Sequence, residues 1–454
     1  MNDIASAALK SNSWRESKMH EVADGRAKIF KKTLKYVPSA PCLPLSRPPE
    51  LRADVTLMSV YNRSQTLSYV TRVTSRRGDA SIIVKVFGMR KLSPRLQRSL
   101  AEAPSEAHLL DEHEVEVRYL ELLSHMMRGG LLDCVTMVLG FCLVTREELV
   151  GLGYVSGGET ALFPEGKYGT GKYVVIFAES ADCSLTALVH QKATAAALPL
   201  ATSADVESLR YTVHAAVFQI MFAIATIHRV FPSFRHNDMH ASNILIQYID
   251  VEAIAAHLKL LPDEPIVVEY AMDDLRWQVD LRRAPFRVLV WDLNYASINA
   301  ADANMHGLTH VLPRCREYGA LVPLSKVAPN QYCDIHKCLD TLTWVLSLEK
   351  YGGALEKLFQ QTKRLLAYVV PQGRSCREDL CKTKLDRKAK QQWVHSEPLH
   401  TNPTEILMEQ NFFQDMEVSA HQHRARPVYR LRADGLTHDS ETRLPPTLFS
   451  YRDK

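Results

Sequence analysis

The sequence has few of the features that mark nucleic-acid-binding, membrane or secreted proteins. Its 454 residues carry a formal net charge of only +4, which gives no electrostatic footprint for DNA, RNA or an anionic membrane. We expect no apolar run of transmembrane length, and the N-terminal segment lacks the apolar core of a secretory signal. These absences predict no specific nucleic-acid partner, no membrane partner and a cytoplasmic location.

Cysteine patterns that bind zinc or build a disulfide framework are also missing. The nine cysteines are scattered, and Cys376 and Cys381 have no second pair nearby. His421 and His423 lie close together in the sequence, again without further ligands beside them. Because a structural zinc site needs four ligands, we expect reduced thiols and no zinc site.

Glycine is absent from the whole segment between Leu57 and Val73. Glycine-rich loops bind phosphates because their backbone amides can approach the ligand closely. A loop of that kind is therefore excluded here. A phosphate bound by this segment would need side chains, such as those of Arg63 and Ser64.

The hydrophobic pattern predicts a β-rich part followed by a helical part, which is an α+β fold. A long apolar helix is predicted at residues 203–231, with Ser203 as its N-terminal cap and Glu207 in its first turn. Strands are predicted at 67–73, 80–87, 134–144, 172–180, 243–249 and 286–291, and further helices at 111–127, 331–352, 354–370 and 402–416.

Four parts follow from this pattern. We expect an N-terminal extension and proline-rich linker at 1–50, a sheet with one helix at 51–178, a helical part at 179–418, and a tail at 419–454. The helical part contains an insertion at about 248–285 that resembles a β-hairpin. Asp273 and Asp274 in this insertion are expected to form a solvated turn. The basic run at 374–392 is expected to be a solvated helix face.

Lys85 is a charged residue inside an apolar strand, and a buried charge needs a partner. Glu116 on the following helix is the best candidate, because it lies beside the apolar stripe of that helix. Glu114 is the second choice. The alternative interpretation is a lysine on a half-exposed edge strand that extends its ammonium into water.

A second polar group is the stretch HNDMHASN, residues 236–243, directly before an apolar strand. Asp238 and Asn243 lie five residues apart, so both oxygens could face one ligand. Asp292 follows another apolar strand, where a carboxylate is well placed to reach a metal. Magnesium prefers such oxygen ligands. The alternatives are a capped turn around His236 and a strand-ending turn that includes Asn294.

Together these motifs resemble the protein-kinase-like superfamily. HNDMHASN is similar to its H-R-D-x-x-x-x-N catalytic loop. Five positions match in family order: Lys85, His236, Asp238, Asn243 and Asp292. The resemblance covers about residues 55–416, and it implies a bilobal protein-kinase-like fold with a β-rich N-lobe and a helical C-lobe.

Two further segments strengthen the resemblance. Residues 173–189 resemble the strand, hinge and helix that line an adenine pocket, with Glu179 near the hinge. Residues 327–342 resemble the end of an activation segment and the central helix of the C-lobe. Within them, Asp334 matches the aspartate that braces the catalytic loop.

The resemblance also implies roles for these residues. Asp238 would accept the proton of the substrate hydroxyl, and Lys85, held by Glu116, would position the ATP phosphates. Asn243 and Asp292 would coordinate Mg²⁺, and His240 would lie near the transferring phosphate.

The most similar members are the Ser/Thr protein kinases of large nucleocytoplasmic DNA viruses. They imply an ATP- and Mg²⁺-dependent enzyme with a protein substrate, acting in the cytoplasm of an infected cell or packaged in the virus particle. His240 is also typical of small-molecule phosphotransferases such as aminoglycoside and choline kinases. A pseudokinase or scaffold is the alternative from a different class. The oligomeric state is left open.

The sequence departs from the family pattern at several positions. Asn294 replaces the D-F-G glycine, so the usual hinge for that motif is missing. Asn237 replaces an arginine that commonly pairs with a phosphorylated activation loop, which argues against that form of control. Asn330 replaces the A-P-E glutamate. The missing glycine-rich loop and the missing D-F-G glycine favour the pseudokinase alternative, whereas the retained catalytic groups oppose it.

Overall fold

The computed structural model describes Lys32 and residues 43–44, 49–52, 55–61, 68–76, 80–88, 112–128, 132–155, 172–298, 314–317, 320–323, 333–347, 351–369 and 427–432, apart from seven internal positions, together with parts of 403–416. Several residues named in the sequence analysis lie outside these ranges, as does the basic run. They are Arg63, Ser64, Asp273, Asp274, Asn330, Cys376, Cys381, His421 and His423.

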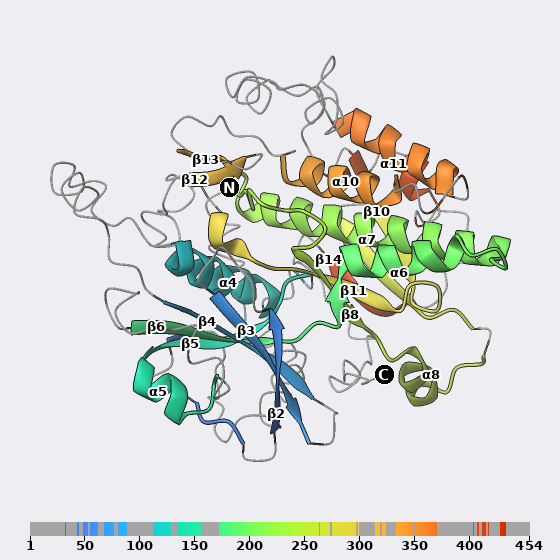
Figure 1. Cartoon of the computed structure of the whole chain (residues 1–454). Coiled ribbons are helices and arrows are strands. Elements are labelled where there is room, and N and C mark those ends of the chain that lie inside the picture. The colour runs from blue at the N-terminus through green and yellow to red at the C-terminus, as the bar shows by residue number, and fades with distance from the viewer. Residues whose placement is uncertain are drawn as a thin grey trace.

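The first part of the chain forms a six-stranded sheet (Figure 1). Its strands pair antiparallel, except that β1 is parallel to β5. In spatial order they are β1 (Leu43–Pro44), β5 (Val138–Thr145), β6 (Lys172–Glu179), β4 (Ser81–Gly88), β3 (Ser68–Ser75) and β2 (Val55–Tyr61). The predicted strands are therefore confirmed. One short strand, β1, comes from the segment expected to be a linker.

Strand β4 lies inside the sheet and is buried along its whole length, as its run of β-branched residues leads us to expect. Helix α4 (Glu112–Arg128) covers one face of the sheet (Figure 1). Its stripe of Val117, Leu120, Leu123 and Met127 is buried. Burying a side chain of this size contributes about 1.5–3 kcal/mol, so packing of this stripe fixes the helix on the sheet. Helix α5 (Arg146–Gly151) follows β5.

The second part of the chain is mainly helical (Figure 1). Its helices are α6 (Leu185–Ala196), α7 (Ser203–Val230), α8 (Val251–Leu258), α10 (Cys333–Leu346) and α11 (Glu356–Val369), with short 3-10 turns η3 (Leu293–Tyr295) and η6 (Asn411–Phe413). Its strands are β7 (Cys183–Ser184), β8 (Ile244–Tyr248), β9 (Val267–Met272), β10 (Leu275–Asp280), β11 (Phe286–Val290), β12 (Arg314–Glu317), β13 (Ala320–Pro323) and β14 (Pro427–Arg432). The predicted helices at 331–352 and 354–370 are confirmed, and the one at 402–416 is only partly described.

Helix α7 runs through the middle of the helical part (Figure 1). Its N-cap is Thr202, and the prediction of Ser203 was wrong by one residue. The Thr202 hydroxyl accepts from the amide of Asp205, whose carboxylate accepts from the amide of Thr202. This reciprocal capping box requires the Thr-x-x-Asp spacing, which Ser203 does not provide.

Helix α7 also corrects the expectation that no segment has transmembrane length. It is 28 residues long and apolar enough to cross a membrane by length and composition, but 89% of its most apolar stretch is buried inside the fold. The apolar side chains that would suit a bilayer pack here in the core of the protein.

A small sheet of β11, β8 and β7 positions the polar motifs. Strand β8 pairs antiparallel with β11, and Ile244 lies opposite Val290. Directly beyond this pair, the amide of Trp291 donates to the carbonyl of Asn243 at 3.2 Å. The last residue of the loop at 236–243 therefore lies close to the segment that carries Asp292.

The insertion forms the predicted hairpin of β9 and β10, and it belongs to the core. Tyr270 and Trp277 pack against Phe218 of α7, with ring centroids 5.1 and 5.6 Å apart. Phe413 also packs against Phe218. Strand β14, from the segment expected to be a tail, pairs in parallel with β9. The hairpin is thus held between the central helix and a returning strand.

Candidate active site

The structure brings Lys85 and Glu116 together in the interior. The Lys85 ammonium lies 2.6 and 2.7 Å from the two carboxylate oxygens of Glu116, and both side chains are buried. Strand β4 holds the lysine at its centre, and α4 presents the glutamate from its buried stripe. The side chain of Glu114, the second choice, lies outside the described residues.

Asp292 joins this pair from the helical part of the chain. Its Oδ1 lies 3.0 Å from the ammonium of Lys85, and its side chain is 30% exposed. Burial alone would lower the pKa of Lys85, but the charges of Asp292 and Glu116 outweigh it and raise that pKa above its ordinary value. Burial would raise the pKa of Asp292, yet Lys85 holds it below its ordinary value. Lys85 and Asp292 are therefore both charged at neutral pH.

Backbone geometry turns Asp292 towards Lys85. Asp292 has φ 63° and ψ 61°, which is left-handed and uncommon for a residue with a side chain. It directly precedes η3, whose Leu293 is fully buried and which packs against α4. The same α4 therefore supports both carboxylates that contact Lys85. Asn294, which the sequence resemblance aligns with the D-F-G glycine, is buried as well.

Asp334 on α10 binds the backbone of the loop at 236–243. One carboxylate oxygen accepts from the amide of His236 at 2.6 Å, and the other accepts from the amide of Asn237 at 2.8 Å. Asn237 has a left-handed φ of 63°. Such a conformation costs on the order of 1–3 kcal/mol unless the surroundings impose it. Asparagine tolerates it better than most residues, which gives a physical reason for Asn237 at this position.

The imidazole of His236 links the loop to the neighbouring strand. Its Nε2 lies 2.8 Å from the carbonyl of Trp291, and its Nδ1 lies 3.4 Å from the amide of Asp238. A ring that carries its proton on Nε2 satisfies both contacts. His236 therefore has a supporting position behind the loop, between Asp238 and the segment that carries Asp292.

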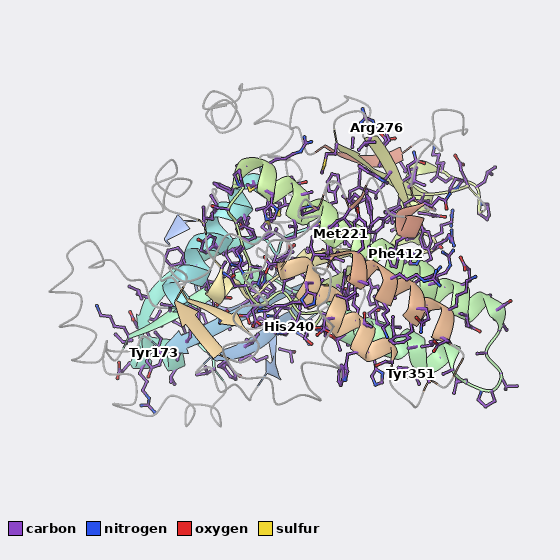
Figure 2. All side chains as sticks on the ribbon, turned by 90° about the horizontal axis from the view of Figure 1, so that it is seen from above. Tyr173, Met221, His240, Arg276, Tyr351 and Phe412 are labelled. Carbon is purple, nitrogen blue, oxygen red and sulfur yellow. The ribbon has the colours of Figure 1, made fainter. Side chains whose placement is uncertain are left out.

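Asp238 and His240 face each other across the front of the loop. His240 Nε2 lies 3.8 Å from Oδ2 of Asp238. Burial lowers the pKa of His240 below its ordinary value, more than the Asp238 carboxylate raises it. A neutral imidazole can still donate one hydrogen bond. In Figure 2, His240 lies between Tyr173 of the sheet and Tyr351 of the helical part.

Asn243 and Asp292 supply oxygen atoms at the same edge of the small sheet. The side-chain amide of Asn243 donates to the carbonyl of Asp238 at 3.0 Å, and this leaves its oxygen as an acceptor. Asp292 uses Oδ1 for Lys85. Magnesium is commonly bound by one or two protein oxygens and completes its shell with water and phosphate. The donor set fits that pattern. Within the part of the chain that the structure describes, no cluster of three or more His, Cys, Asp or Glu side chains could hold a metal.

Glu179, expected to bind the cofactor near the hinge, makes contacts within the protein through its side chain. Its carboxylate accepts from the amide of Met137 at 2.8 Å and lies 3.5 Å from the guanidinium of Arg287. Both charged side chains are buried, and Arg287 also donates to Gln247. The carboxylate therefore ties the end of β6 to strand β11. The sequence around Glu179 could not reveal its contact with Arg287, because Arg287 lies more than a hundred residues away.

Two other residues near the site were missed by the sequence analysis. Lys337 on α10 lies 3.9 Å from Oδ1 of Asp238. The ring of Trp291 lies 5.3 Å from the ammonium of Lys85, a distance at which a cation–π attraction operates. The position of Trp291 directly before Asp292 could have suggested it. Lys337 lies three residues after Asp334, and that spacing was the available signal.

The comparisons with known proteins agree with this chemistry at a coarse level. No family model matches the chain. It is 26% identical over 136 residues to a protein of Acanthamoeba polyphaga mimivirus described as a "putative serine/threonine-protein kinase". The matched segment is 28% of this chain and 23% of the viral protein. The chain therefore has a distant kinase-like relationship, restricted to a minor part of both proteins.

Proposed function

We propose that this protein is an ATP- and Mg²⁺-dependent phosphotransferase with a bilobal protein-kinase-like fold, acting on Ser or Thr hydroxyls of proteins. One observation carries the proposal. The ammonium of Lys85 joins Glu116 of the sheet part to Asp292 of the helical part, 2.6 and 3.0 Å away. The limited similarity to the mimivirus protein supports the same reaction class.

ATP and Mg²⁺, when bound, would supply the transferable phosphoryl group and neutralise its charge. Lys85 would hold the phosphates, because it carries a fixed positive charge between the two carboxylates of the polar cluster. Asn243 and Asp292 would hold the metal through their side-chain oxygens. These residues thus bind and orient, and positioning of that kind accounts for most of the catalysis in phosphoryl transfer.

Asp238 is the group that would orient the acceptor hydroxyl and take its proton. Its carboxylate is part of a loop whose backbone is bound by Asp334 and, at the carbonyl of Asp238, by the side-chain amide of Asn243. His240, as a neutral donor beside Asp238, would hydrogen-bond a phosphate oxygen. We further propose a protein substrate and the cytoplasm of an infected cell as the setting, following the resemblance to viral kinases.

The test is phosphate transfer by the purified full-length chain. The protein is incubated with γ-labelled ATP and Mg²⁺, with a general protein substrate and without one. We expect labelled protein for the native sequence and a rate at least about 100-fold lower for Asp238→Asn, because general-base catalysis contributes roughly 10²–10⁴-fold. Glu356→Gln, an exposed change on α11, is the matched control and should leave the rate unchanged.

Three outcomes would contradict the proposal. Labelling that is equal in Asp238→Asn would remove Asp238 from its role. Binding of ATP and Mg²⁺ without any transfer would favour the pseudokinase alternative. Transfer to an aminoglycoside or to choline, with no transfer to protein, would favour the alternative of a small-molecule kinase, a class in which a histidine at the position of His240 is typical.

A further inference from the structure

Helix α10 presents two opposite charges to the backbone of one residue of the loop, Asn237. Asp334 accepts from the amide of Asn237 at 2.8 Å, and Lys337 donates to the carbonyl of the same residue. The two side chains are three residues apart on one helix, which places them on the same face. The peptide groups on both sides of the Asn237 Cα atom are therefore held by a single rigid element.

Holding this residue from both sides matters because of its conformation. Asn237 is in the left-handed region with φ 63°, and a residue with a side chain stays there only when its surroundings impose it. Asp238 follows directly, so the direction of its side chain depends on this turn. A contact that fixes the carbonyl of Asn237 fixes the start of Asp238 as well.

Lys337 also contacts Asp238 electrostatically. Its ammonium lies 3.9 Å from Oδ1 of Asp238, and its side chain is only 11% exposed. At that distance the contact is an ion pair without a hydrogen bond. His240 Nε2 lies 3.8 Å from the other oxygen, Oδ2. The two carboxylate oxygens of Asp238 therefore have different neighbours, a cation on one side and an imidazole on the other.

The loop itself cannot provide this positive charge. Residues 237–243 read NDMHASN and include no lysine or arginine. The lysine beside Asp238 therefore comes from another element, and it is Lys337 of α10. Because the side chain is mostly buried, solvent screens this charge less than it would screen a surface lysine.

We propose that Lys337 is a positioning residue of the phosphotransfer site, whose ammonium orients the Asp238 carboxylate and fixes the Asn237 peptide for acceptance of the substrate proton. The inference rests on the proposed function and adds to it a residue that neither the motif nor the resemblance assigns. It explains how a catalytic loop without a cation keeps its aspartate directed at a substrate.

The experiment compares Lys337→Met, Lys337→Arg and Lys357→Met in the full chain, with steady-state transfer from labelled ATP. Lys357 is exposed on α11 and is the matched lysine control. We expect Lys337→Met to lower kcat roughly 10- to 100-fold, the cost of small misplacements of reacting groups. The KM for ATP should stay within about twofold, since Lys337 orients the proton acceptor and does not bind phosphate. Lys337→Arg should recover most of kcat, and Lys357→Met should match the native rate.

A second measurement separates positioning from a purely structural role. Single-turnover rates are compared for Asp238→Asn and for the double variant with Lys337→Met. If Lys337 acts through Asp238, the second change should have almost no further effect, because groups that act as a unit are not additive. An equal loss in both backgrounds would overturn the inference, as would full activity of Lys337→Met.

The outcome for the native chain distinguishes the two proposals. A native protein that transfers no phosphate overturns the proposed function and the inference with it. An active native protein whose rate is insensitive to Lys337→Met overturns the inference alone. A fall in melting temperature for Lys337→Met that Lys337→Arg does not reverse, with parallel losses of kcat and ATP affinity, would also overturn it in favour of a structural role.

Discussion

The two sides of the candidate site are held by different kinds of interaction. On the sheet side, side chains hold side chains, because Lys85 bonds to Glu116 and Asp292. On the helical side, a side chain holds backbone, because Asp334 accepts from the amides of His236 and Asn237. One side is an ionic cluster that spans two parts of the fold, and the other is a loop fastened to one helix.

This difference bears on what each side can do. The cluster depends on groups separated by 31 and 207 positions in the chain, so it forms only when the sheet part and the helical part are correctly placed. The loop depends on a backbone conformation that α10 imposes locally. We infer that the ionic side is sensitive to the relative placement of the two parts, whereas the loop keeps its shape as long as α10 does.

The largest effect is expected from breaking the ionic side. Lys85→Met leaves the fully buried carboxylate of Glu116 without its main partner. Removing one member of a buried ion pair costs about 3–5 kcal/mol, so the free energy of unfolding should fall by that amount in urea titrations. The double variant Lys85→Met with Glu116→Leu should recover much of the stability, because only Asp292, whose side chain is 30% exposed, then lacks Lys85 as a partner. It should not recover phosphate transfer.

Lys357→Met is again the control and should leave the free energy of unfolding within about 0.5 kcal/mol of the native value. A cost below about 1 kcal/mol for Lys85→Met would mean that the Lys85–Glu116 pair is not buried as the structure has it. Failure of the double variant to recover would show that shape, not charge, dominates on this side.

The next largest effect is expected from breaking the helical side. Asp334→Ala leaves two buried backbone amides without their acceptor, at roughly 1–3 kcal/mol each, so we expect a loss of about 2–6 kcal/mol in unfolding free energy. Asp334→Asn keeps one oxygen and should lose about half as much. Calorimetry and urea unfolding would measure both.

No second substitution can restore the stability lost in Asp334→Ala, because the two amides left without an acceptor belong to the backbone. The loss caused by Lys85→Met differs, because a second substitution at Glu116 can offset it. Glu356→Ala, exposed on α11, is the control. Equal stabilities of Asp334→Ala and the native chain would show that the loop does not depend on α10.

The smallest effect is expected from acid. His336 lies on α10 between Asp334 and Lys337, and burial, followed by the charge of Lys337, lowers its pKa to about 3. In the unfolded chain its pKa returns to about 6.5, so the unfolded state binds the proton more readily. Stability is therefore full above pH 6.5 and falls as the pH drops towards 3.

At pH 5.5 this group alone should cost about 1.4 kcal/mol relative to pH 7.5. His336→Gln, which does not titrate, should flatten the difference between unfolding free energies measured at these two pH values. An unchanged slope in that variant would contradict the burial of His336.

Much of the site could be predicted because its chemistry is local in the sequence. A lysine within a run of β-branched residues requires a buried partner, and the next helix offered Glu116 beside its apolar stripe. The apolar run after Asn243 predicted a strand there, as β8 shows, and the hypothesis that Asp238 and Asn243 direct their oxygens at one ligand stays a prediction. Periodicity also predicted α4, α10 and α11 to within a few residues.

Two features could not be predicted because they depend on tertiary contacts. The side chain of Glu179 is engaged by Arg287 and Met137, which the chain brings near only after folding. The apolar length of α7 is explained by its burial, which its composition cannot report. The capping error at Ser203 is of another kind, because the Thr202–Asp205 spacing was present in the sequence.

By itself, then, the sequence determined which polar groups must be accommodated and which strands and helices carry them, because hydrophobic periodicity and the cost of an unpaired buried charge act over short distances. Only the tertiary structure decided how those groups are held. It set Asp334 and Lys337 around Asn237, turned Glu179 towards Arg287, and brought Asp292 to Lys85. Such contacts between distant segments depend on how the sheet and helices pack, and packing is fixed only when the whole core forms.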